Sequence, residues 1–455
     1  MKVAVRLVFC LFPLSVFSQQ PINMQRALQR TLTLETIPQQ GEQLSLQQAI
    51  QTALEKNYQI QITRSQEEIA RNNYDKGTVG YYPLLTGNFN SNGSYQNISQ
   101  TFLNDLRPPL DINGVFNRTN TVGLNANYSI LDFSRSPSYN RLGELVRLSE
   151  VNTRANMEAT AASVTTSYYD VIRQLQRLIA FRQALDISRE RLELARANYE
   201  VGTRSKVDFL SAQVDYNADS AALVAQEQSL RNAKILLNTL LVREPATEFA
   251  IRDTILVRSD LSIESLRQSI NNNPLLVQAV LNRRLTDLDV RIARVQQLPL
   301  VNLTTGYNQT FVNNQGGFGV KTAHNRGLTY GVSAAIPIFN GYNVKRQIAN
   351  AKVNTQIAQQ QEADQRLQLL SALEQTYTQY RNNLTLLNLE LQNFNIARQN
   401  VDIAFERYRV GNSTAVEFRD VQRNAVAAET RLIDAEFNAK TAEIELLRLS
   451  STIMQ

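Results

Sequence analysis

The sequence of 455 residues contains one cysteine and one histidine, so it is poor in the side chains that most often carry redox and metal chemistry. Cys10 lies in an apolar N-terminal stretch that we interpret as part of a signal peptide, so the mature chain is expected to hold no thiol and no disulfide. His324 stands among Asn and Lys in a stretch predicted to be a surface loop, with no second His or Cys to complete a zinc site. We therefore expect no metal and no cofactor.

A recognisable catalytic arrangement is also missing from the sequence. The Gly-rich run at residues 316–319 joins two predicted strands and lacks the helix start that phosphate binding requires. No nucleophile is accompanied by a base in a known catalytic pattern. We expect that the protein is not an enzyme.

Long apolar runs are absent beyond the N-terminus. Residues 1–18 combine Lys2 and Arg6 with an apolar stretch, which is typical of a secretory signal peptide. After it, no run of about 18 apolar residues occurs, so no membrane-spanning helix is predicted. The net charge of +6 comes from Lys and Arg scattered among Asp and Glu, which favours solvated helix faces over nucleic-acid binding.

An internal repeat organises the rest of the chain. Residues 199–213 (YEVGTRSKVDFLSAQ) return as residues 408–422 (YRVGNSTAVEFRDVQ), an offset of 209 residues that indicates a duplication. Each copy is typical of a sharp turn between two helices, with Gly202 or Gly411 in a left-handed cap. Ser205 with Asp208, and Thr414 with Glu417, match the capping box that begins the next helix.

Helical and strand periodicities alternate in the same order in both halves. Helices are predicted over 44–75, 138–199, 205–242, 261–296, 343–409 and 414–452, the first and fourth ending before Pro83 and Pro299. Strands are predicted over 85–97, 121–130, 301–311 and 328–338, with joining segments at 98–120 and 312–327, which gives one β-hairpin per half. Residues 243–260 are interpreted as a linker or a small equatorial element.

The predicted strands have an apolar and a polar face and are long enough to cross a bilayer when tilted. The alternative is a soluble two-stranded hairpin, but such a hairpin is marginal in water and no other sheet is predicted beside it. Membrane barrels begin at about eight strands, so four cannot close one. Several chains must therefore contribute strands, and we expect an oligomer.

Coiled-coil spacing runs through the long helices. The first-half positions are Val164, Tyr168, Val171, Leu175, Leu178, Leu185 and Leu192, with Arg182 as the one break. The second-half positions are Leu373, Tyr377, Tyr380, Leu384, Leu387, Leu391, Phe394 and Val401. We expect the seam tyrosines to pack in the core rather than to bind substrate.

The signal peptide, the duplicated helix–hairpin–helix–turn–helix and the paired Tyr-x-x-Gly turns together resemble the TolC-like outer-membrane efflux proteins, over about residues 44–449. The resemblance implies two repeats, 44–242 and 261–452, in a mainly α-helical chain with four transmembrane strands. It implies a homotrimer whose 12-stranded barrel in the outer membrane continues as an α-helical tunnel across the periplasm. It also implies two partners, a periplasmic adaptor and an inner-membrane pump.

The resemblance assigns roles to the residues around the two turns. Glu417 and Asp420 match acidic residues that ring the closed entrance, while Asp208 and Tyr408 match positions that hold the entrance shut. Ser413 stands where some members place an arginine for that clasp, with Arg204 and Arg409 as possible substitutes. The adaptor-docking tips would be Gly202, Thr203, Arg204 and Ser205 with Gly411, Asn412, Ser413 and Thr414.

Simpler interpretations stay open for these residues. Asp208 and Glu417 are also explained by helix capping, and Asp420 by an ordinary solvated carboxylate. For the whole chain, the alternative from another class is a secreted coiled-coil spacer or stalk of the cell envelope. That alternative does not explain the duplicated turns or the strands with one apolar face.

Overall fold

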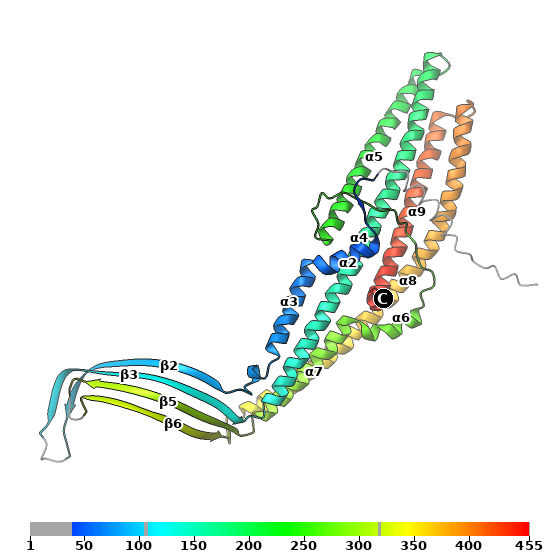
Figure 1. Cartoon of the computed structure of the whole chain (residues 1–455). Coiled ribbons are helices and arrows are strands. Elements are labelled where there is room, and N and C mark those ends of the chain that lie inside the picture. Colours follow the sequence, from blue (N-terminus) through cyan, green and yellow to red (C-terminus); the bar gives the residue numbers. More distant parts are fainter. Residues whose placement is uncertain (1–38, 104–107, 317–319, 455) are drawn as a thin grey trace, which may run out of the picture. The chain divides into compact units, whose positions relative to one another are not determined.

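The computed structural model describes residues 39–103, 108–316 and 320–454, so the predicted signal peptide, Cys10 and most of the Gly-rich run lie outside the described residues. The chain divides into two compact units, whose helices and strands are labelled in Figure 1. Unit 1 contains residues 39–57, 158–268 and 372–454, and unit 2 contains residues 58–157 and 269–371. Helices predominate and one larger sheet is present, which confirms the mainly α class with a β portion.

Unit 2 holds a four-stranded antiparallel sheet. Its strands are β2 (Leu84–Gln100), β3 (Leu110–Leu131), β5 (Leu300–Asn314) and β6 (Thr322–Ala335), in the order β2-β3-β5-β6. The predicted joining segment 98–120 was wrong, because β3 begins at Leu110 and its first half alternates too weakly to be recognised. The fourth strand lies earlier than 328–338, and it includes His324, whose ring stacks on Phe311 with the centroids 4.4 Å apart, so His324 is not in a loop.

Pairing between β3 and β5 joins the two predicted hairpins into one sheet. The sequence predicts no other sheet beside either hairpin, but in the structure each hairpin lies beside the other. The register separates the side chains into two faces. One face carries Leu85, Phe89, Val122, Leu124, Tyr128, Leu303, Tyr307, Leu328, Tyr330 and Val332. The other carries Asn88, Asn90, Thr121, Asn125, Thr304, Asn308, Thr310 and Thr329. The predicted apolar and polar faces are confirmed.

Side-chain hydrogen bonds cross the strands on the polar face. Asn125 donates to Asn88 at 2.5 Å, and the hydroxyls of Thr121 and Thr310 lie 3.3 Å apart. The apolar face instead leaves large side chains exposed, among them Phe89 and Tyr330. Among the described residues of one chain, no layer of side chains covers this face.

The helices of unit 2 are α3 (Tyr58–Asn73), the short 3-10 turns η1 (Gly77–Val79) and η2 (Ile270–Asn272), and α7 (Pro274–Val295). The predicted single helices 44–75 and 261–296 are both broken. The first breaks at Asn57, which is extended (ψ 126°), and the second at Asn273, where Pro274 disfavours a helical conformation of the preceding residue. Asn273 caps α7 through its side chain, which accepts from the Leu275 N–H at 2.9 Å.

Unit 1 contains α2 (Leu46–Lys56), α5 (Lys206–Leu240), α6 (Ile263–Ser269), α9 (Ala415–Leu449) and a parallel pair of short strands, β1 (Glu42–Gln43) and β4 (Phe249–Ala250). The long helices α4 (Arg135–Glu200) and α8 (Asn343–Arg409) contribute to both units. The predicted bounds of the four long helices agree with the structure to within three residues. The segment 243–260 packs Phe249, Ile251 and Ile255 into the core beside α2, α4 and α5, so it is an element of the fold rather than a loose linker.

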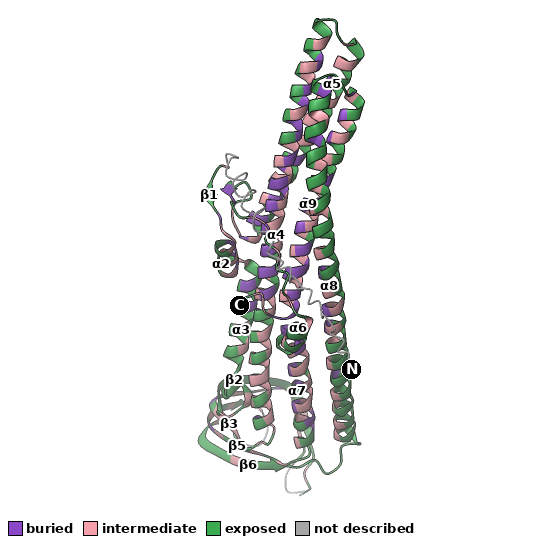
Figure 2. Ribbon diagram, turned by 90° about the vertical axis from the view of Figure 1, so that its right-hand side faces the viewer, coloured by how far each residue is buried: buried purple, intermediate pink, exposed green. Residues whose placement is uncertain are grey.

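Burial along the seam differs between the halves (Figure 2). In α4, Val164, Tyr168, Val171, Leu175, Leu178 and Leu185 are buried, whereas in α8 only Leu373, Tyr380, Leu387 and Val401 are. Tyr168 and Tyr380 are core residues, as predicted, whereas Tyr377 is only half-buried. The Tyr168 hydroxyl donates to the Leu44 carbonyl at 3.0 Å, and its repeat equivalent Tyr377 approaches the Leu261 carbonyl at 3.4 Å.

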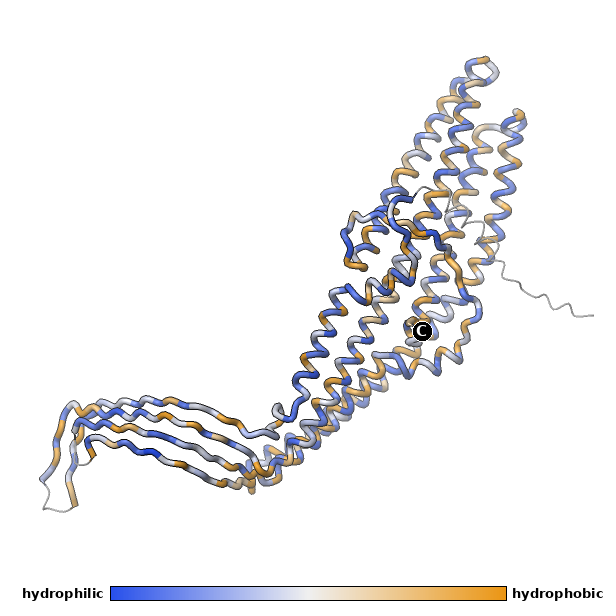
Figure 3. Tube along the Cα trace, in the orientation of Figure 1, coloured by the Kyte–Doolittle hydropathy of each residue, from blue (hydrophilic) through white to orange (hydrophobic). Residues whose placement is uncertain are grey.

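Hydrophilic residues interrupt the apolar ones along the long helices (Figure 3). Among the described residues, none of the helices combines the length and the apolar character that a membrane-crossing helix needs.

Candidate functional site

The two turns of the repeat share one backbone conformation in unit 1. We call residues 201–205 the first tip and residues 410–414 the second tip. Gly202 (φ 75°) and Gly411 (φ 83°) both adopt the left-handed conformation, and each donates its N–H to the tyrosine carbonyl three residues before it. The next N–H groups return to Asn198 and Arg407 at 2.9 and 2.8 Å. The predicted left-handed glycine caps are confirmed.

The second tip contains a complete capping box. The Thr414 hydroxyl accepts from the Glu417 N–H at 3.2 Å, and the Glu417 carboxylate accepts from the Thr414 N–H at 3.5 Å. The Ser413 hydroxyl adds a hydrogen bond of 2.8 Å to the same carboxylate. The hydrogen bond from Ser413 has the largest effect on the pKa of Glu417, followed by the one from the Thr414 N–H. Both hold this pKa below its usual value, because they stabilise the ionised carboxylate.

The first tip has only half of that box. The Ser205 hydroxyl accepts from the Asp208 N–H at 3.3 Å. Among the described residues, no hydrogen bond returns from the Ser205 N–H to the Asp208 carboxylate, so the predicted box is corrected to a simple cap. Aspartate is one methylene shorter than glutamate, which explains why Glu417 closes its box and Asp208 does not.

Aromatic pairs close both tips at matched positions. Tyr199 stacks on Phe209 with an interplanar angle of 6°, and Tyr408 stacks on Phe418 with an angle of 15°. Tyr408 is 3% exposed, and burial raises its pKa. The recurrence of Tyr and Phe in the two copies is therefore a packing requirement of the turn.

Arg204 of the first tip contacts Tyr408, which lies two residues before the second tip. Its guanidinium carbon lies 5.7 Å from the centre of the Tyr408 ring, within the range of a cation–π contact. Arg409 instead pairs with Glu406 of its own helix at 2.8 Å. Of the two arginines considered for the clasp position, Arg204 is the one that contacts Tyr408. Within the described chain, no hydrogen bond joins Asp208 to Tyr408.

The predicted gate carboxylates are exposed. Glu417 and Asp420 are three residues apart on α9, a spacing that places them on one side of the helix. Glu417 is held by the second tip, whereas Asp420 has no hydrogen bond or ion pair within the parts of the chain that the structure describes. A copy of α9 therefore presents one fixed and one free carboxylate.

A polar cluster below the tips was missed at the sequence level. Arg419 binds Asp219 through two hydrogen bonds of 2.7 and 2.8 Å and lies 3.5 Å from Asp215, which also pairs with Arg191. Arg191 is 1% exposed. The Asp219 carboxylate also accepts from Ser188.

Gln422 belongs to the same cluster and extends it to α4. Its buried amide donates to the Ala184 carbonyl and to the Ser188 hydroxyl, both at 3.0 Å. The cluster thus ties α9 to both helices of the first hairpin. The recurrence of Gln at the end of the repeated segment was the one sequence signal that pointed to it.

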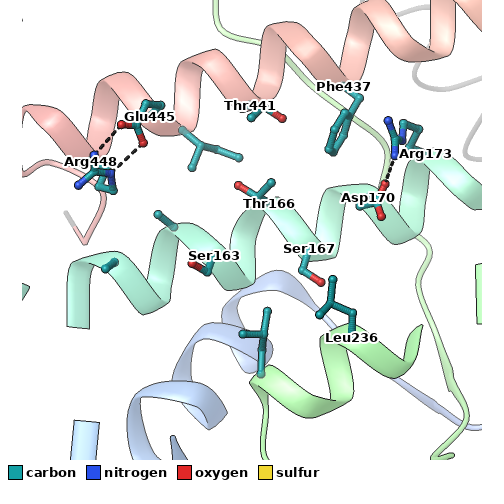
Figure 4. Close-up of a pocket in the computed structure, with 14 residues that line it drawn as sticks. Ser163, Thr166, Ser167, Asp170, Arg173, Leu236, Phe437, Thr441, Glu445 and Arg448 are labelled. Carbon is teal, nitrogen blue, oxygen red and sulfur yellow. Dashed lines mark hydrogen bonds and ion pairs between the residues drawn. The ribbon is translucent and has the colours of Figure 1, made fainter. Parts of the chain in front are cut away.

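A second feature of unit 1 is a cavity of about 640 Å³ between α4, α9 and the end of α5 (Figure 4). Its charged residues are paired to one another: Arg173 with Asp170 at 2.5 Å, and Arg448 with Glu445 at 2.6 Å. The hydroxyl oxygens of Ser167 and Thr441 are buried there and have no hydrogen-bond partner in the part of the chain that the structure describes. The cavity offers hydroxyl groups but no unpaired charge. Among the described residues, no cluster of His, Cys, Asp and Glu is arranged to hold a metal ion.

Comparison with known proteins identifies relatives over nearly the whole described chain. The family model described as outer membrane efflux protein matches residues 49–242 and 265–451. Outer membrane protein TolC of Escherichia coli is 22% identical over 353 residues, covering 74% of this chain and 70% of TolC. Outer membrane efflux protein BepC of Brucella suis is 22% identical over 411 residues, covering 88% of this chain and 83% of BepC. The crystal structure of outer membrane protein VceC from Vibrio cholerae has a TM-score of 0.70 at 17% identity, covering 89% of this chain and 95% of that one.

Proposed function

Because the chain belongs to the outer membrane efflux protein family, we propose that three copies form one export channel in the outer membrane. The observation that carries the proposal is the four-stranded sheet with one apolar and one polar face. Its edges, β2 and β6, have no partner strand in the sheet order of the single chain. Three sheets of four strands give a barrel of 12, with the apolar face toward lipid and the Asn/Thr face toward the pore.

The helices continue the channel on the periplasmic side in this proposal. All four strands connect to helices at one end of the sheet, while the segments 101–109 and 315–321 join strands at the other end. The long helices are polar over much of their surface, which suits a water-filled tunnel between three chains. Residues 44–242 and 261–452 are treated as two repeats of one unit, preceded by a signal peptide at 1–18.

The tips are proposed as the docking site of a periplasmic adaptor protein, which connects the channel to an inner-membrane pump. The glycines at Gly202 and Gly411 let each turn project with its backbone open, since nothing lies within 4 Å of the position of an added Cβ. The channel itself would act passively, with neither a cofactor nor catalysis.

The periplasmic entrance is proposed to be gated at the second tip. Three copies of Glu417 and Asp420 would bring six carboxylates together, which attracts cations and repels anions. Asp208 and Tyr408 would hold the closed form together. With Ser413 bonded to Glu417, the Arg204–Tyr408 contact supports Arg204 as the cation that links neighbouring coils.

Single-channel recording in planar lipid bilayers tests this function. The purified protein should open steady conductances that prefer cations, and the double variant E417Q/D420N should lose most of that preference. E406Q, which removes a carboxylate already paired with Arg409, should keep it. A protein that adds no conductance would favour the coiled-coil spacer instead.

A further inference from the structure

The strands carry an unusual distribution of charge. Across β2, β3, β5 and β6, the permanently charged residues are Arg118, Arg326 and a single acid, Asp111, which stands near the start of β3. Both arginines are exposed. Because the two arginines have no acid beside them on these strands, their position calls for an explanation.

Both arginines lie on the apolar face. Arg118 is on β3, four residues from Val122 on the same face and opposite Gly93 of β2. Arg326 is on β6 opposite Gln309, which in turn is opposite Val122. Arg118 is nearer than Val122 to the start of β3 at Leu110, so it lies toward the end of the sheet where segments 101–109 and 315–321 join the strands.

Among the described residues, neither arginine forms an ion pair, and the one acid of the strands, Asp111, lies seven residues from Arg118 along β3. The Arg118 Nε lies 3.4 Å from the Ser91 hydroxyl, a neutral partner. An unpaired guanidinium facing hydrocarbon is disfavoured, and this cost falls where the side chain reaches the level of the lipid headgroups, whose phosphates can supply an anionic partner. The guanidinium fork matches the oxygens of a phosphate.

We infer that Arg118 and Arg326 bind phosphate groups of lipid headgroups in the outer-facing leaflet, at the end of the sheet away from the helices. The inference rests on the proposed function, which turns the apolar face toward lipid. Strand spacing and rise place the two Cα atoms about 17 Å apart, so each arginine takes its own phosphate. Phe311 and His324, stacked at 4.4 Å on the level between them, supply a flat surface for the lipid body.

The test compares melting temperatures in nanodiscs of phosphatidylcholine alone and with added diphosphorylated lipid A, the phosphate-bearing glycolipid of outer membranes. The wild-type protein should melt several degrees higher with lipid A and show no such gain with dephosphorylated lipid A. R118Q/R326Q should lose the gain. K345Q/K352Q, which removes two charges from α8 outside the strands, should retain it. R118L/R326L should also lose the rise in melting temperature that lipid A causes. Its melting temperature in phosphatidylcholine alone can increase, because leucine is favoured against hydrocarbon.

Three results would overturn the inference: an equal gain in the arginine variants, an equal gain with dephosphorylated lipid A, or an equal gain from inorganic phosphate added in detergent. Conductance is recorded on the same preparations. If the channel conducts but lipid A does not raise its melting temperature, only the lipid-binding inference is contradicted. If the preparation does not conduct, the proposed function is contradicted.

Discussion

The guanidinium of Arg419 on α9 donates one hydrogen bond to each carboxylate oxygen of Asp219 on α5, at 2.7 and 2.8 Å. The two side chains are 16% and 17% exposed, so water screens this pair far less than a surface ion pair. The contact joins the two helical hairpins of one chain just below the tips. It fixes the helix that carries Glu417 and Asp420 relative to its neighbour.

Replacing Arg419 by Gln should therefore destabilise the folded chain by about 2 kcal/mol, because it leaves the Asp219 carboxylate half-buried without its strongest partner. The measurement is the melting temperature in detergent, followed by circular dichroism. R409Q is the matched control, since Arg409 pairs with Glu406 at the surface and such pairs contribute about 0–1 kcal/mol. Equal decreases in melting temperature for the two variants would show that the Arg419 contact stabilises the chain no more than a surface ion pair does.

The left-handed glycine of the second tip gives a second prediction. Gly411→Ala should cost about 1 kcal/mol, because alanine is strained at a φ of 83° even though nothing lies near its Cβ. Gly411→Asn should cost less, since Asn tolerates this conformation better. Thermal melting of both variants is compared with G327A, a site that is equally open but has no positive φ. An alanine variant as stable as wild type would contradict the assigned turn.

Ser413 should control the titration of Glu417. The lowered pKa of Glu417 means that its contribution to stability is present above its usual pKa and lost as the pH falls through the lowered value. Ser413→Ala removes the principal donor, so the pKa of Glu417 should rise toward normal. The difference in melting temperature between about pH 7 and about pH 3 should then shrink. S229A, which removes a hydroxyl bonded only to a helix carbonyl, should leave that difference unchanged.

The hydroxyl of Tyr168 should contribute more to the free energy of unfolding than that of its repeat equivalent, Tyr377. The Tyr168 hydroxyl donates to the Leu44 carbonyl at 3.0 Å and to the Asp253 carboxylate at 2.5 Å. Burial raises the pKa of Tyr168, and the hydrogen bond to Asp253 and the negative charge of Asp253 raise it further. Tyr168→Phe leaves both acceptors short of a donor and should cost about 1–3 kcal/mol. Tyr377→Phe should cost less, because that tyrosine is only half-buried and its bond is 3.4 Å long. Denaturant-induced unfolding of both variants and of the wild type measures the two losses of stability and shows which is larger.

Local sequence patterns predicted the elements better than their connections. The helix over 343–409 was expected with the bounds that α8 has, and both glycine turns were found, because periodicity and left-handed caps are local signals. The break at Asn273 was overlooked although Pro274 stands inside the predicted helix. The first half of β3 was assigned to a loop because Asn, Gly and Arg obscure its alternation.

Contacts between distant segments could not be predicted in the same way. Arg419, Asp219 and Asp215 look like ordinary charges on solvated helix faces, and only the packing of α9 on the first hairpin brings them together. The same holds for Ser413 and Glu417, where the sequence suggested a cap but not the additional serine donor. The pairing of β3 with β5, which makes one sheet from two hairpins, likewise depends on the tertiary fold.

In the proposed channel, one chain supplies a third of the membrane barrel. This stoichiometry is tested most directly by the mass of the mature protein extracted in mild detergent, with the detergent contribution subtracted. We expect the mass of three chains, since a sheet of four strands cannot close a barrel alone. A monomer that stays soluble in water without detergent would contradict the proposed barrel.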